Sequence, residues 1–485
     1  MNAPNIVFIL IDDLGQRDIG CYGSTFYETP NIDRLARDGM LFTNAYAACP
    51  VCSPTRASIL TGRYPANLGI TNYIDWTGKG HPSKGRLVDV PYVSELPGDI
   101  PNLATELRDR GYATWHVGKW HLGPEPAWPD KRGFDRNIGG WTPGLPTSGY
   151  FSPWGMPTLE DGPEGEYLTD RLTDEALALI RNRDAGRPFF LNLWYYAVHT
   201  PIQAKPDIVE KYRRKARLLG LDRVEALVEG PAFPTEHKKD RRILRRVLQS
   251  DITYAAMIEI LDENIGRLME TLDAEGLADD TIVIFTSDNG GLSSSEGSPT
   301  CNAPLAEGKG WMYEGGTREP LLVRWPAVVA AGSTSPAVVT STDFLPTLLE
   351  AAGSPDPVPS GVEGETFLPI LRGDASSLVR DAIFWHYPHY GNQGGTPGSS
   401  VRSGRFKLIE FFETGRLELY DLEADVGENH DRSNELPEVR DRLHRMLTEW
   451  RERVEAKIPQ QNPDYLPWPD AALESRHLVP GVEFD

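Results

Sequence analysis

The sequence of 485 residues has little cysteine and no long apolar run, and both shortages narrow what it can encode. Four cysteines are too few to form a disulfide-stabilised scaffold of this length. No stretch of about 18 consecutive apolar residues is present, so no membrane-spanning helix is expected. The opening residues, MNAPNIVFILIDDLGQ, have no basic segment before their short apolar run. We interpret them as a core strand rather than a signal peptide, and we expect a cytoplasmic protein with no membrane partner.

The sequence also has fewer basic than acidic residues. Lys and Arg number 49 against 70 Asp and Glu, which gives a formal net charge of −21 at pH 7. This charge argues against nucleic acid as a partner, because nucleic-acid-binding surfaces are strongly basic. A protein this acidic needs a local cationic pocket if it is to bind an anion. The 40% of hydrophobic residues in a chain of this length is enough for a large core and for more than one domain.

Short apolar runs alternate with amphipathic stretches over most of the chain. Four of the runs have the continuous apolar character of strands that are buried on both faces: residues 6–11, 113–118, 188–198 and 281–287. Helical periodicity occurs between them and is clearest in residues 251–275. The alternation predicts an α/β fold, with a large, mostly parallel mixed sheet flanked by helices. We also expect residues 206–248, a highly charged segment, to be a helical insertion.

The pattern changes after the Gly/Pro-rich stretch GSPDPVPSGVEG at residues 353–364. The segments AIFWHYP, SVRSGRFKLIEFF and RLELYDL are typical of antiparallel strands, and a helix is expected from about residue 435 to 457. We therefore predict two units: a main α/β domain at residues 1–375 and a smaller C-terminal α+β subdomain at residues 376–485, built from an antiparallel sheet and a helix.

Reactive side chains follow each of the four predicted strands, at the point where the strand ends. They are Asp12-Asp13, Lys119 with His121, His199, and Asp288-Asn289. In open α/β sheets, ligands bind beyond the carboxyl ends of the strands. Each of these residues could by itself be a solvated loop residue, but together they predict an active site.

Four of these residues carry oxygen atoms that can ligate a metal ion: Asp12, Asp13, Asp288 and Asn289. Such a set suits a hard divalent cation, calcium or magnesium, better than zinc, which prefers His and Cys. The alternative is structural, with one Asp capping a helix and the other occupying a turn.

The stretch AACPVCSPTRASILTGRYP, residues 47–65, contains two of the four cysteines. Ser53-Pro54 is typical of a helix start and Gly62 of a helix end, so Cys52 is expected just before a helix N-terminus, with Arg56 one turn further on. A zinc site would need a second Cys or His cluster at ligand spacing, and the sequence shows none. A thioredoxin-like pair would leave the proline and the arginine without a role, and two buried structural thiols remain an alternative.

The string Cys-Ser-Pro-Thr-Arg, residues 52–56, resembles the signature of the type I, formylglycine-dependent sulfatases of the alkaline phosphatase superfamily. The segments IDDLG, GKWHLG, AVHTP, SDNGG and GKGWMYEGGTREP stand in the order found in that family, so the resemblance covers most of residues 4–326. Cys49 has Ser53 where the family has Arg, and Cys52 is therefore the cysteine to which the resemblance applies. Thr55 occupies a position where Ser is commoner in the family.

The resemblance implies a sulfatase that hydrolyses a sulfate ester. Cys52 would be oxidised to Cα-formylglycine by a formylglycine-generating enzyme, which is the expected protein partner, and the hydrated aldehyde would be the nucleophile. The metal, usually calcium in the family and with magnesium as the alternative, would be held by Asp12, Asp13, Asp288, Asn289 and residue 52 itself.

The resemblance also implies roles for the remaining site residues. Arg56 would stabilise the hydrate, and Lys119 and Lys309 would neutralise sulfate oxygens, as expected of cations beside developing negative charge. His199 would lie at the leaving-group oxygen and His121 near the formylglycine hydroxyls, where a base is needed. These cations and the metal would form the local anion pocket that the acidic composition requires.

Two other functions remain open from the sequence. One is a phosphonate monoester or phosphodiester hydrolase, because relatives in the superfamily share the metal site and some share the formylglycine. The other is a non-catalytic sulfoglycan-binding protein, which would result if Cys52 is never oxidised.

The expected substrate is a sulfated small molecule or oligosaccharide, most plausibly a sulfated sugar, with aryl sulfates as model substrates. Two loops, at residues 384–395 and 75–86, could border the entrance to the site. His386, His389 and Tyr390 in the first loop are candidate substrate contacts. The alternative is that these three side chains pack between the subdomains.

Overall fold

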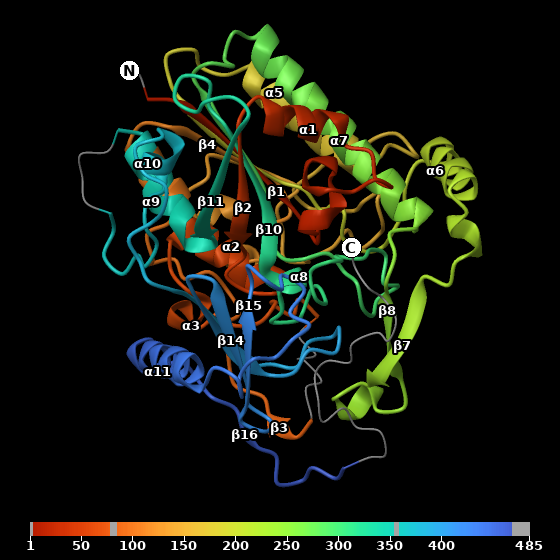
Figure 1. Cartoon of the computed structure of the whole chain (residues 1–485). Helices are drawn as coiled ribbons and strands as arrows, with labels where there is room; N and C mark the ends of the chain where they lie inside the picture. Colours follow the sequence, from red (N-terminus) through yellow and green to blue (C-terminus); the bar gives the residue numbers. More distant parts are fainter. Residues whose placement is uncertain (1–2, 78–84, 354–357, 468–485) are drawn as a thin grey trace.

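The computed structural model describes residues 3–77, 85–353 and 358–467 of the chain. Its largest element is an eight-stranded sheet with the strand order β11-β2-β10-β9-β1-β6-β4-β5 (Figure 1). All strands run in one direction except β10, which is antiparallel to its neighbours β2 and β9. The mostly parallel mixed sheet is therefore confirmed, with strands β1 (Asn5–Ile11), β2 (Met40–Tyr46), β4 (Ala113–Gly118), β5 (Arg136–Ile138), β6 (Phe189–Trp194), β9 (Thr281–Ser287), β10 (Arg318–Arg324) and β11 (Ser333–Thr340).

The two faces of the sheet pack into separate hydrophobic cores, because side chains alternate along each strand. In β1, one core contains Val7, Ile9 and Ile11, and the other contains Ile6, Phe8 and Leu10. Each of these side chains is fully buried, which contributes about 1.5–3 kcal/mol apiece. The first face is covered by α1 (Pro30–Arg37), α5 (Leu168–Arg181), α6 (Pro206–Leu218) and α7 (Ile252–Ala274), and the second by α2 (Cys52–Thr61), α4 (Leu103–Asp109), α9 (Phe344–Ala351) and α10 (Leu368–Leu371).

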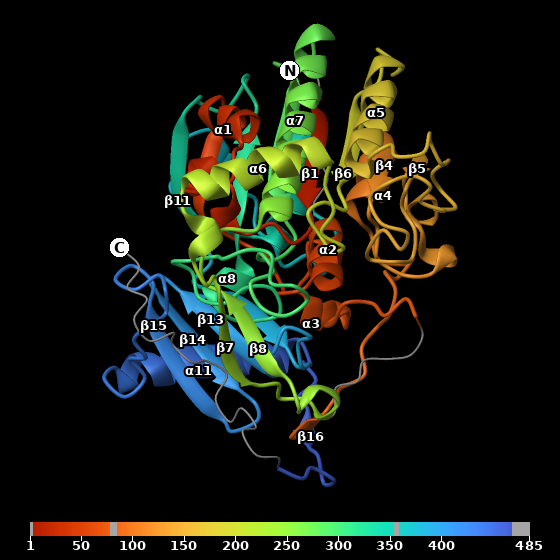
Figure 2. The same cartoon turned by 90° about the vertical axis from the view of Figure 1, so that its right-hand side faces the viewer.

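The C-terminal part of the chain forms a second, smaller sheet beside the carboxyl ends of the main strands (Figure 2). Its four strands are all antiparallel: β12 (Ile383–Tyr387), β13 (Gly398–Ser403), β14 (Phe406–Phe411) and β15 (Arg416–Asp421). One face packs on α11 (Pro437–Arg453), and the other packs on residues of the main part such as Trp311 and Tyr313. The expected antiparallel sheet with a helix is confirmed, and the boundary at residue 375 stays a prediction.

The remaining elements are short. Two strands, β3 (Leu87–Val88) and β16 (Gln460–Gln461), pair with each other. The other helical segments are α3 (Pro65–Leu68), α8 (Glu314–Thr317), η1 (Gln16–Asp18), η2 (Gly20–Tyr22), η3 (Glu125–Ala127), η4 (Pro129–Lys131), η5 (Leu221–Arg223), η6 (Glu236–Lys238) and η7 (Ser341–Asp343). Among the described residues, no helix combines the length and the apolar character that a membrane crossing requires.

The expectation of a helical insertion at residues 206–248 is wrong for its second half. Only α6 is a long helix; it is followed by an antiparallel pair, β7 (Leu227–Ala232) and β8 (Arg242–Arg246). In β8, Ile243 and Arg245 are buried while Leu244 is exposed, which is the period of a strand. The high charge of the segment concealed this alternation.

The predicted strand at residues 188–198 is too long, because β6 ends at Trp194. The next residues stay buried, so the apolar run gives no sign of where the strand ends. Their backbone instead bonds to the end of β1: Asp12 N–H donates to the Ala197 carbonyl at 3.0 Å, and Val198 N–H donates to the Asp12 carbonyl at 2.9 Å. This connection holds His199 beside the acidic pair that follows β1.

Candidate active site

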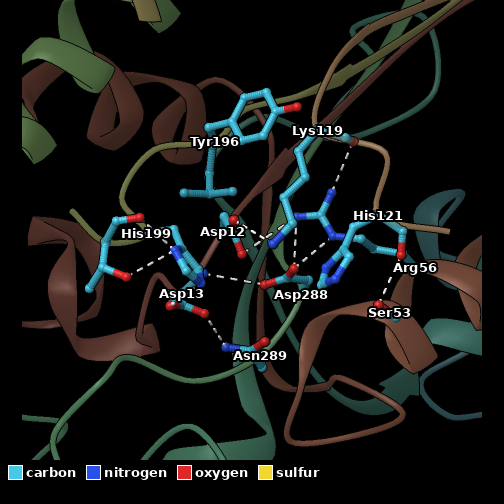
Figure 3. A network of polar contacts seen from close by, with 12 residues as sticks. Asp12, Asp13, Ser53, Arg56, Lys119, His121, Tyr196, His199, Asp288 and Asn289 are labelled. Atoms are coloured by element: carbon cyan, nitrogen blue, oxygen red, sulfur yellow. Dashed lines mark hydrogen bonds and ion pairs between the residues drawn. The ribbon is translucent and has the colours of Figure 1, made fainter. Parts of the chain in front are cut away.

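The reactive residues after the four central strands converge at one point beyond the carboxyl edge of the sheet (Figure 3). Strands β9, β1, β6 and β4 are consecutive in the sheet, so their ends lie side by side. Backbone bonds extend the pairing past the strand ends, with Asp288 N–H donating to the Ile11 carbonyl at 3.1 Å and Lys119 N–H donating to the Trp194 carbonyl at 2.7 Å. The convergence expected from the sequence is therefore present.

Two site residues have left-handed backbone conformations. Asp13 has φ of 62° and His121 has φ of 57°. Such values are uncommon for residues other than glycine, and strained backbone concentrates at functional sites. At Asp13 the conformation ends the alternation of β1, so that two consecutive carboxylates can face the same cluster.

Helix α2 begins at Cys52 itself, with Val51 in the capping position and no side-chain cap. The expectation that Cys52 lies just before the helix is off by one residue, and Ser53 does not cap the helix. Ser53 Oγ donates to the His121 carbonyl at 2.9 Å and accepts from Ile74 N–H at 3.0 Å. It therefore ties the start of α2 to two loops of the site instead of satisfying the helix end. Gly62, with φ of 66°, ends the helix as expected.

Arg56 of α2 is fully buried and reaches across to the end of β9. Its Nε and Nη2 lie 2.8 Å and 2.7 Å from Asp288 Oδ2, and Nη1 donates to the Lys119 carbonyl at 3.3 Å. The guanidinium also lies 5.1 Å from the centre of the Trp194 ring. These contacts fix Arg56 between the helix, the end of β9 and the loop that follows β4.

Two lysines pair with the two carboxylates that follow β1. Lys119 Nζ lies 2.7 Å from Asp12 Oδ2, and Lys309 Nζ lies 2.7 Å from Asp13 Oδ2. His199 Nε2 lies 3.6 Å from the same Asp13 oxygen. The sequence-predicted cations are thus brought to the predicted metal ligands.

The two aspartates have opposite pKa shifts. Burial, reinforced by the neighbouring Asp288 and Asp13 carboxylates and opposed by Lys119, raises the pKa of Asp12 well above its ordinary value. Burial acts in the same direction on Asp13, but Lys309, His199 and Lys119 outweigh it and hold the pKa of Asp13 below its ordinary range. Asp12 is therefore the carboxylate with the greatest need of a further positive charge.

Both histidines of the site are neutral at physiological pH. Burial, together with Lys309, lowers the pKa of His199 to about 3, although Asp13 opposes the shift. Burial and Lys119 lower the pKa of His121 well below its ordinary value. The distance of 2.8 Å between His199 Nδ1 and the Thr200 carbonyl oxygen keeps a proton on Nδ1, and the distance of 2.8 Å between His121 Nε2 and the Ile74 carbonyl oxygen keeps one on Nε2.

The cluster has the composition and the unpaired atoms of a metal site. The ligand atoms of Asp12, Cys52 and Asp288 lie within 4.8 Å of one another. Asp12 Oδ1 and Asn289 Oδ1 are buried without a hydrogen bond. Buried polar atoms are normally paired, so two unpaired oxygens in one cluster fit a cation that prefers oxygen ligands. The residues present therefore fit a divalent metal ion.

A cavity of about 180 Å³ opens onto this cluster. It is lined by four of the predicted residues, Cys52, His121, His199 and Lys309. Trp76, Asn392 and Gln393 of the two loops expected at the entrance also line it, and Tyr73 and Glu296 are lining residues that the sequence did not indicate. Their positions in Gly/Ser-rich or aromatic loops beside the motifs were the available signal, since binding residues concentrate in loops on a rigid scaffold.

The three candidate substrate contacts are not among the residues that line this cavity. His386, His389 and Tyr390 are buried, and each is bonded to protein groups. His389 bonds to Thr71 and Asp89, and Tyr390 O–H donates to Glu413 Oε1 at 2.6 Å. His389 and Tyr390 pack between the two units, as the alternative expectation has it, whereas His386 bonds to Ser399 and to the Lys457 carbonyl within the C-terminal unit. Of the loop at residues 75–86, Trp76 lines the cavity, while residues 78–84 lie outside the described part of the chain.

Fold and site together define an α/β protein in which lysines and histidines surround a carboxylate cluster, a set that can hold an anionic group and a metal ion. Residues 4–354 match the family model described as sulfatase. Residues 307–453 match a model described as the C-terminal region of N-sulphoglucosamine sulphohydrolase.

Individual relatives agree with these matches. The chain is 32% identical to a sulfatase of Formosa agariphila, covering 88% of this chain and 83% of that protein. It is 30% identical to human N-acetylgalactosamine-6-sulfatase, covering 94% of this chain and 87% of that protein. The crystal structure of Ps i-CgsB in complex with k-i-k-neocarrahexaose superposes with a TM-score of 0.74 at 28% identity, covering 96% of this chain and 95% of that one. The chain belongs to the sulfatase family and is a sulfuric ester hydrolase.

Proposed function

We propose that this sulfatase removes a sulfate group from a sulfated carbohydrate, and that Cys52 acts after conversion to formylglycine. The observation that carries the proposal is the cavity in which Cys52, two neutral histidines and a lysine meet above a buried carboxylate cluster. The names of the relatives support the substrate class, since one is an N-acetylgalactosamine-6-sulfatase and another is described in complex with k-i-k-neocarrahexaose.

The proposed metal is calcium, with magnesium as the alternative. Asp12, Asp13, Asp288, Asn289 and residue 52 would hold it, because they supply the oxygen atoms and the position at the start of α2. The formylglycine hydrate would supply the nucleophile, and the cation would polarise the sulfuryl group. The reaction would therefore take place at the floor of the cavity.

The cations of the chain bind and stabilise the anionic group. Without a metal, the three buried carboxylates are balanced by Arg56, Lys119 and Lys309. A divalent cation added to this balanced set leaves an excess of positive charge, which favours a sulfate ester and, still more, the doubly charged sulfate product. Positive groups fixed in advance around the sulfuryl oxygens stabilise the charge that develops during cleavage.

The two histidines are oriented for proton transfer at different atoms. His199 keeps its proton on Nδ1, so Nε2 is the atom that takes up a proton from solvent when substrate binds and then gives it to the leaving-group oxygen. His121 keeps its proton on Nε2, and its buried Nδ1 has no hydrogen-bond partner, so Nδ1 is free to accept a proton near residue 52. The negative charge of a bound substrate raises the proton affinity of both rings.

The proposed maturation enzyme acts on the chain before it folds. Cys52, Pro54 and Arg56 are the residues that the signature requires, and all three are buried in the folded protein. A second enzyme could reach them only in the unfolded chain. Co-expression with a formylglycine-generating enzyme is therefore expected to raise activity, whereas treatment of folded protein is not.

The function is tested by initial rates on 4-nitrophenyl sulfate and on the matching phosphate and phosphonate esters, with wild-type protein and with Cys52→Ala. We expect sulfate to be the preferred ester and the variant to be inactive. An intact-mass measurement of the tryptic peptide that carries residue 52 reports the conversion directly. A preference for phosphonate or phosphate esters would assign the chain to the other hydrolase class, and an active Cys52→Ala protein would remove residue 52 from the mechanism.

A further inference from the structure

Besides Cys52, His199 and Lys309, the cavity is lined by aromatic, amide and acidic side chains. Glu296, in the loop between β9 and α8, lines the same cavity as Cys52, His199 and Lys309. Its side chain is exposed, and within the described residues it has no hydrogen bond or ion pair. Exposed acidic side chains are common on protein surfaces. In a cavity that binds an anion, however, an acidic side chain is unexpected, because it repels the ligand.

The charge of Glu296 acts on the cavity and not only on solvent. After burial, Glu296 is the largest cause of the raised pKa of Tyr73, which also lines the cavity. The charge of Glu296 therefore reaches an aromatic residue of the cavity lining.

Trp76 supplies an exposed aromatic surface to the same cavity. Trp76 is 42% exposed, and it lines the cavity together with Tyr73. A large aromatic ring at the mouth of a pocket offers apolar area to a flat ligand face, such as the C–H face of a sugar ring. Carboxylate and amide groups nearby can then fix the orientation of that ring through its hydroxyl groups.

The lining of the cavity comes from separate segments of the chain, and hydrogen bonds join these segments to one another. Ser294 Oγ donates to the Gln393 carbonyl at 3.0 Å, and Asn392 Nδ2 donates to the Tyr73 hydroxyl at 3.0 Å. Lys238, from η6, donates to the Asn392 carbonyl at 2.8 Å from outside the lining. Glu296 therefore lines the cavity beside residues that hydrogen bonds hold in place.

We propose that Glu296 and Trp76 form a leaving-group subsite that selects a sugar with a single sulfate and free hydroxyl or amino groups beside it. The inference rests on the proposed function. The carboxylate accepts hydrogen bonds from such groups, whereas a second sulfate or a carboxylate at the same position meets a like charge. The subsite therefore discriminates against doubly anionic sugars, although the adjoining sulfate pocket attracts anions.

The test compares how sugars inhibit hydrolysis of 4-nitrophenyl sulfate. The probes are N-acetylgalactosamine 6-sulfate and the 4,6-disulfate, and the proteins are wild type, Glu296→Gln and Glu236→Gln. Glu236 is an exposed residue of η6 outside the cavity lining, so its variant makes the same change in net charge. For wild type we expect the monosulfate to have the lower inhibition constant.

In Glu296→Gln the preference for the monosulfate is expected to fall by about tenfold, which is the size of a like-charge contact at a partly exposed site. Added salt should reduce the wild-type preference, because exposed charges are screened. In Glu236→Gln the preference should stay as in wild type. Trp76→Ala is expected to weaken inhibition by both sugars equally.

An unchanged preference in Glu296→Gln, or the same loss in both Glu variants, would overturn the subsite while leaving sulfatase activity in place. Failure of the proposed function has a different signature, because wild type would then not hydrolyse 4-nitrophenyl sulfate at all. Calorimetric titration of the Cys52→Ala protein with the two sugars gives the same comparison without turnover, so the subsite is also tested in that case.

Discussion

The protein contains two buried clusters of charged side chains, and they differ in how completely their atoms are paired. The first is the active-site cluster of aspartates, lysines and Arg56 (Figure 3). The second, which we call the inter-sheet cluster, lies between the main part and the C-terminal sheet and consists of Tyr46, Glu314, Arg318, Arg402, Lys407 and Glu428.

In the inter-sheet cluster both oxygens of Glu314 have close partners. Lys407 Nζ lies 2.9 Å from Oε1, while the Tyr46 hydroxyl donates to Oε2 at 2.7 Å and Arg318 Nη1 lies 3.3 Å from it. Burial alone would raise the pKa of Glu314, but Lys407, Arg318 and Arg402 lower it to about 2. In the active site, by contrast, the Asp12 pKa is raised and one Asp12 oxygen has no hydrogen bond.

The difference shows that burial of charges does not by itself identify a functional site. The inter-sheet cluster, in which both oxygens of Glu314 have partners, joins two parts of the fold. A cluster with unpaired oxygens and nitrogens costs stability unless a ligand completes it, which is typical of active sites. We therefore expect changes in the inter-sheet cluster to affect stability, and changes in the active-site cluster to affect turnover and ligand binding.

The largest effect is expected for His199→Ala on a substrate with a poor leaving group. Loss of the proton donor should lower kcat/KM by about 10²–10⁴-fold for an alkyl or sugar sulfate. On 4-nitrophenyl sulfate, whose phenolate needs little protonation, the loss should be much smaller. Steady-state rates on both substrates test this, with His430→Ala as the control because the His430 side chain is exposed. Equal losses on the two substrates would contradict the role of His199 at the leaving group.

Glu314→Gln should have a comparably large effect, but on stability. It leaves the Lys407 ammonium buried with one carboxylate partner fewer, which is expected to cost about 3–5 kcal/mol of unfolding free energy. Urea unfolding measures the loss. The double variant Glu314→Gln with Lys407→Met should recover part of it, since the unpaired charge is gone. A stable Glu314→Gln protein with impaired kcat/KM would reverse the assignment of the two clusters.

The active-site cluster was largely predictable from the sequence, and the inter-sheet cluster was not. The aspartates, His199 and Lys119 each follow an apolar strand within a short motif, and parallel strands end at one edge of the sheet. The residues of the inter-sheet cluster are spread from Tyr46 to Glu428. Glu314 and Arg318 lie in the segment GKGWMYEGGTREP, but nothing in the local sequence connects them with Arg402, Lys407 and Glu428. Only the packing of one sheet on the other brings them together.

The same limit explains why three residues of the loop at residues 384–395 do not line the cavity, although Asn392 and Gln393 of this loop do. Its histidines and tyrosine suggested sugar contacts, but they bond to residues 71–89 of the main part and to Ser399 and Glu413 of the C-terminal sheet and its loops. The actual lining residues Trp76 and Glu296 carry no periodic or motif signal. Local sequence thus indicates groups at strand ends well, and groups that depend on loop packing poorly.

A smaller effect is expected from the pH dependence of stability at His386, which belongs to the C-terminal sheet. Burial lowers its pKa to about 3 from an ordinary value of 6.5, so the unfolded chain binds a proton that the folded chain does not between these values. Stability from this group is present above pH 6.5 and is lost as the pH falls toward 3, with a slope of up to about 1.4 kcal/mol per pH unit.

Urea unfolding of wild type and His386→Asn between pH 4.5 and 7.5 measures this slope. The variant should show a flatter dependence on pH, and His430→Asn should keep the wild-type slope. Identical slopes in wild type and His386→Asn would show that the ring is not buried as a neutral group.

The most direct test of the account follows thermal unfolding and 4-nitrophenyl sulfate hydrolysis of metal-stripped protein as calcium is added. We predict that stripping lowers Tm and abolishes turnover, and that calcium restores both with the same midpoint, adding about 2.7 kcal/mol of stability at one hundred times Kd. Asn289→Ala, which removes an unpaired ligand oxygen, should shift that midpoint to higher calcium, while Glu314→Gln should lower Tm without shifting it. Full activity and unchanged Tm in protein that elemental analysis shows to be free of metal would contradict the central claim.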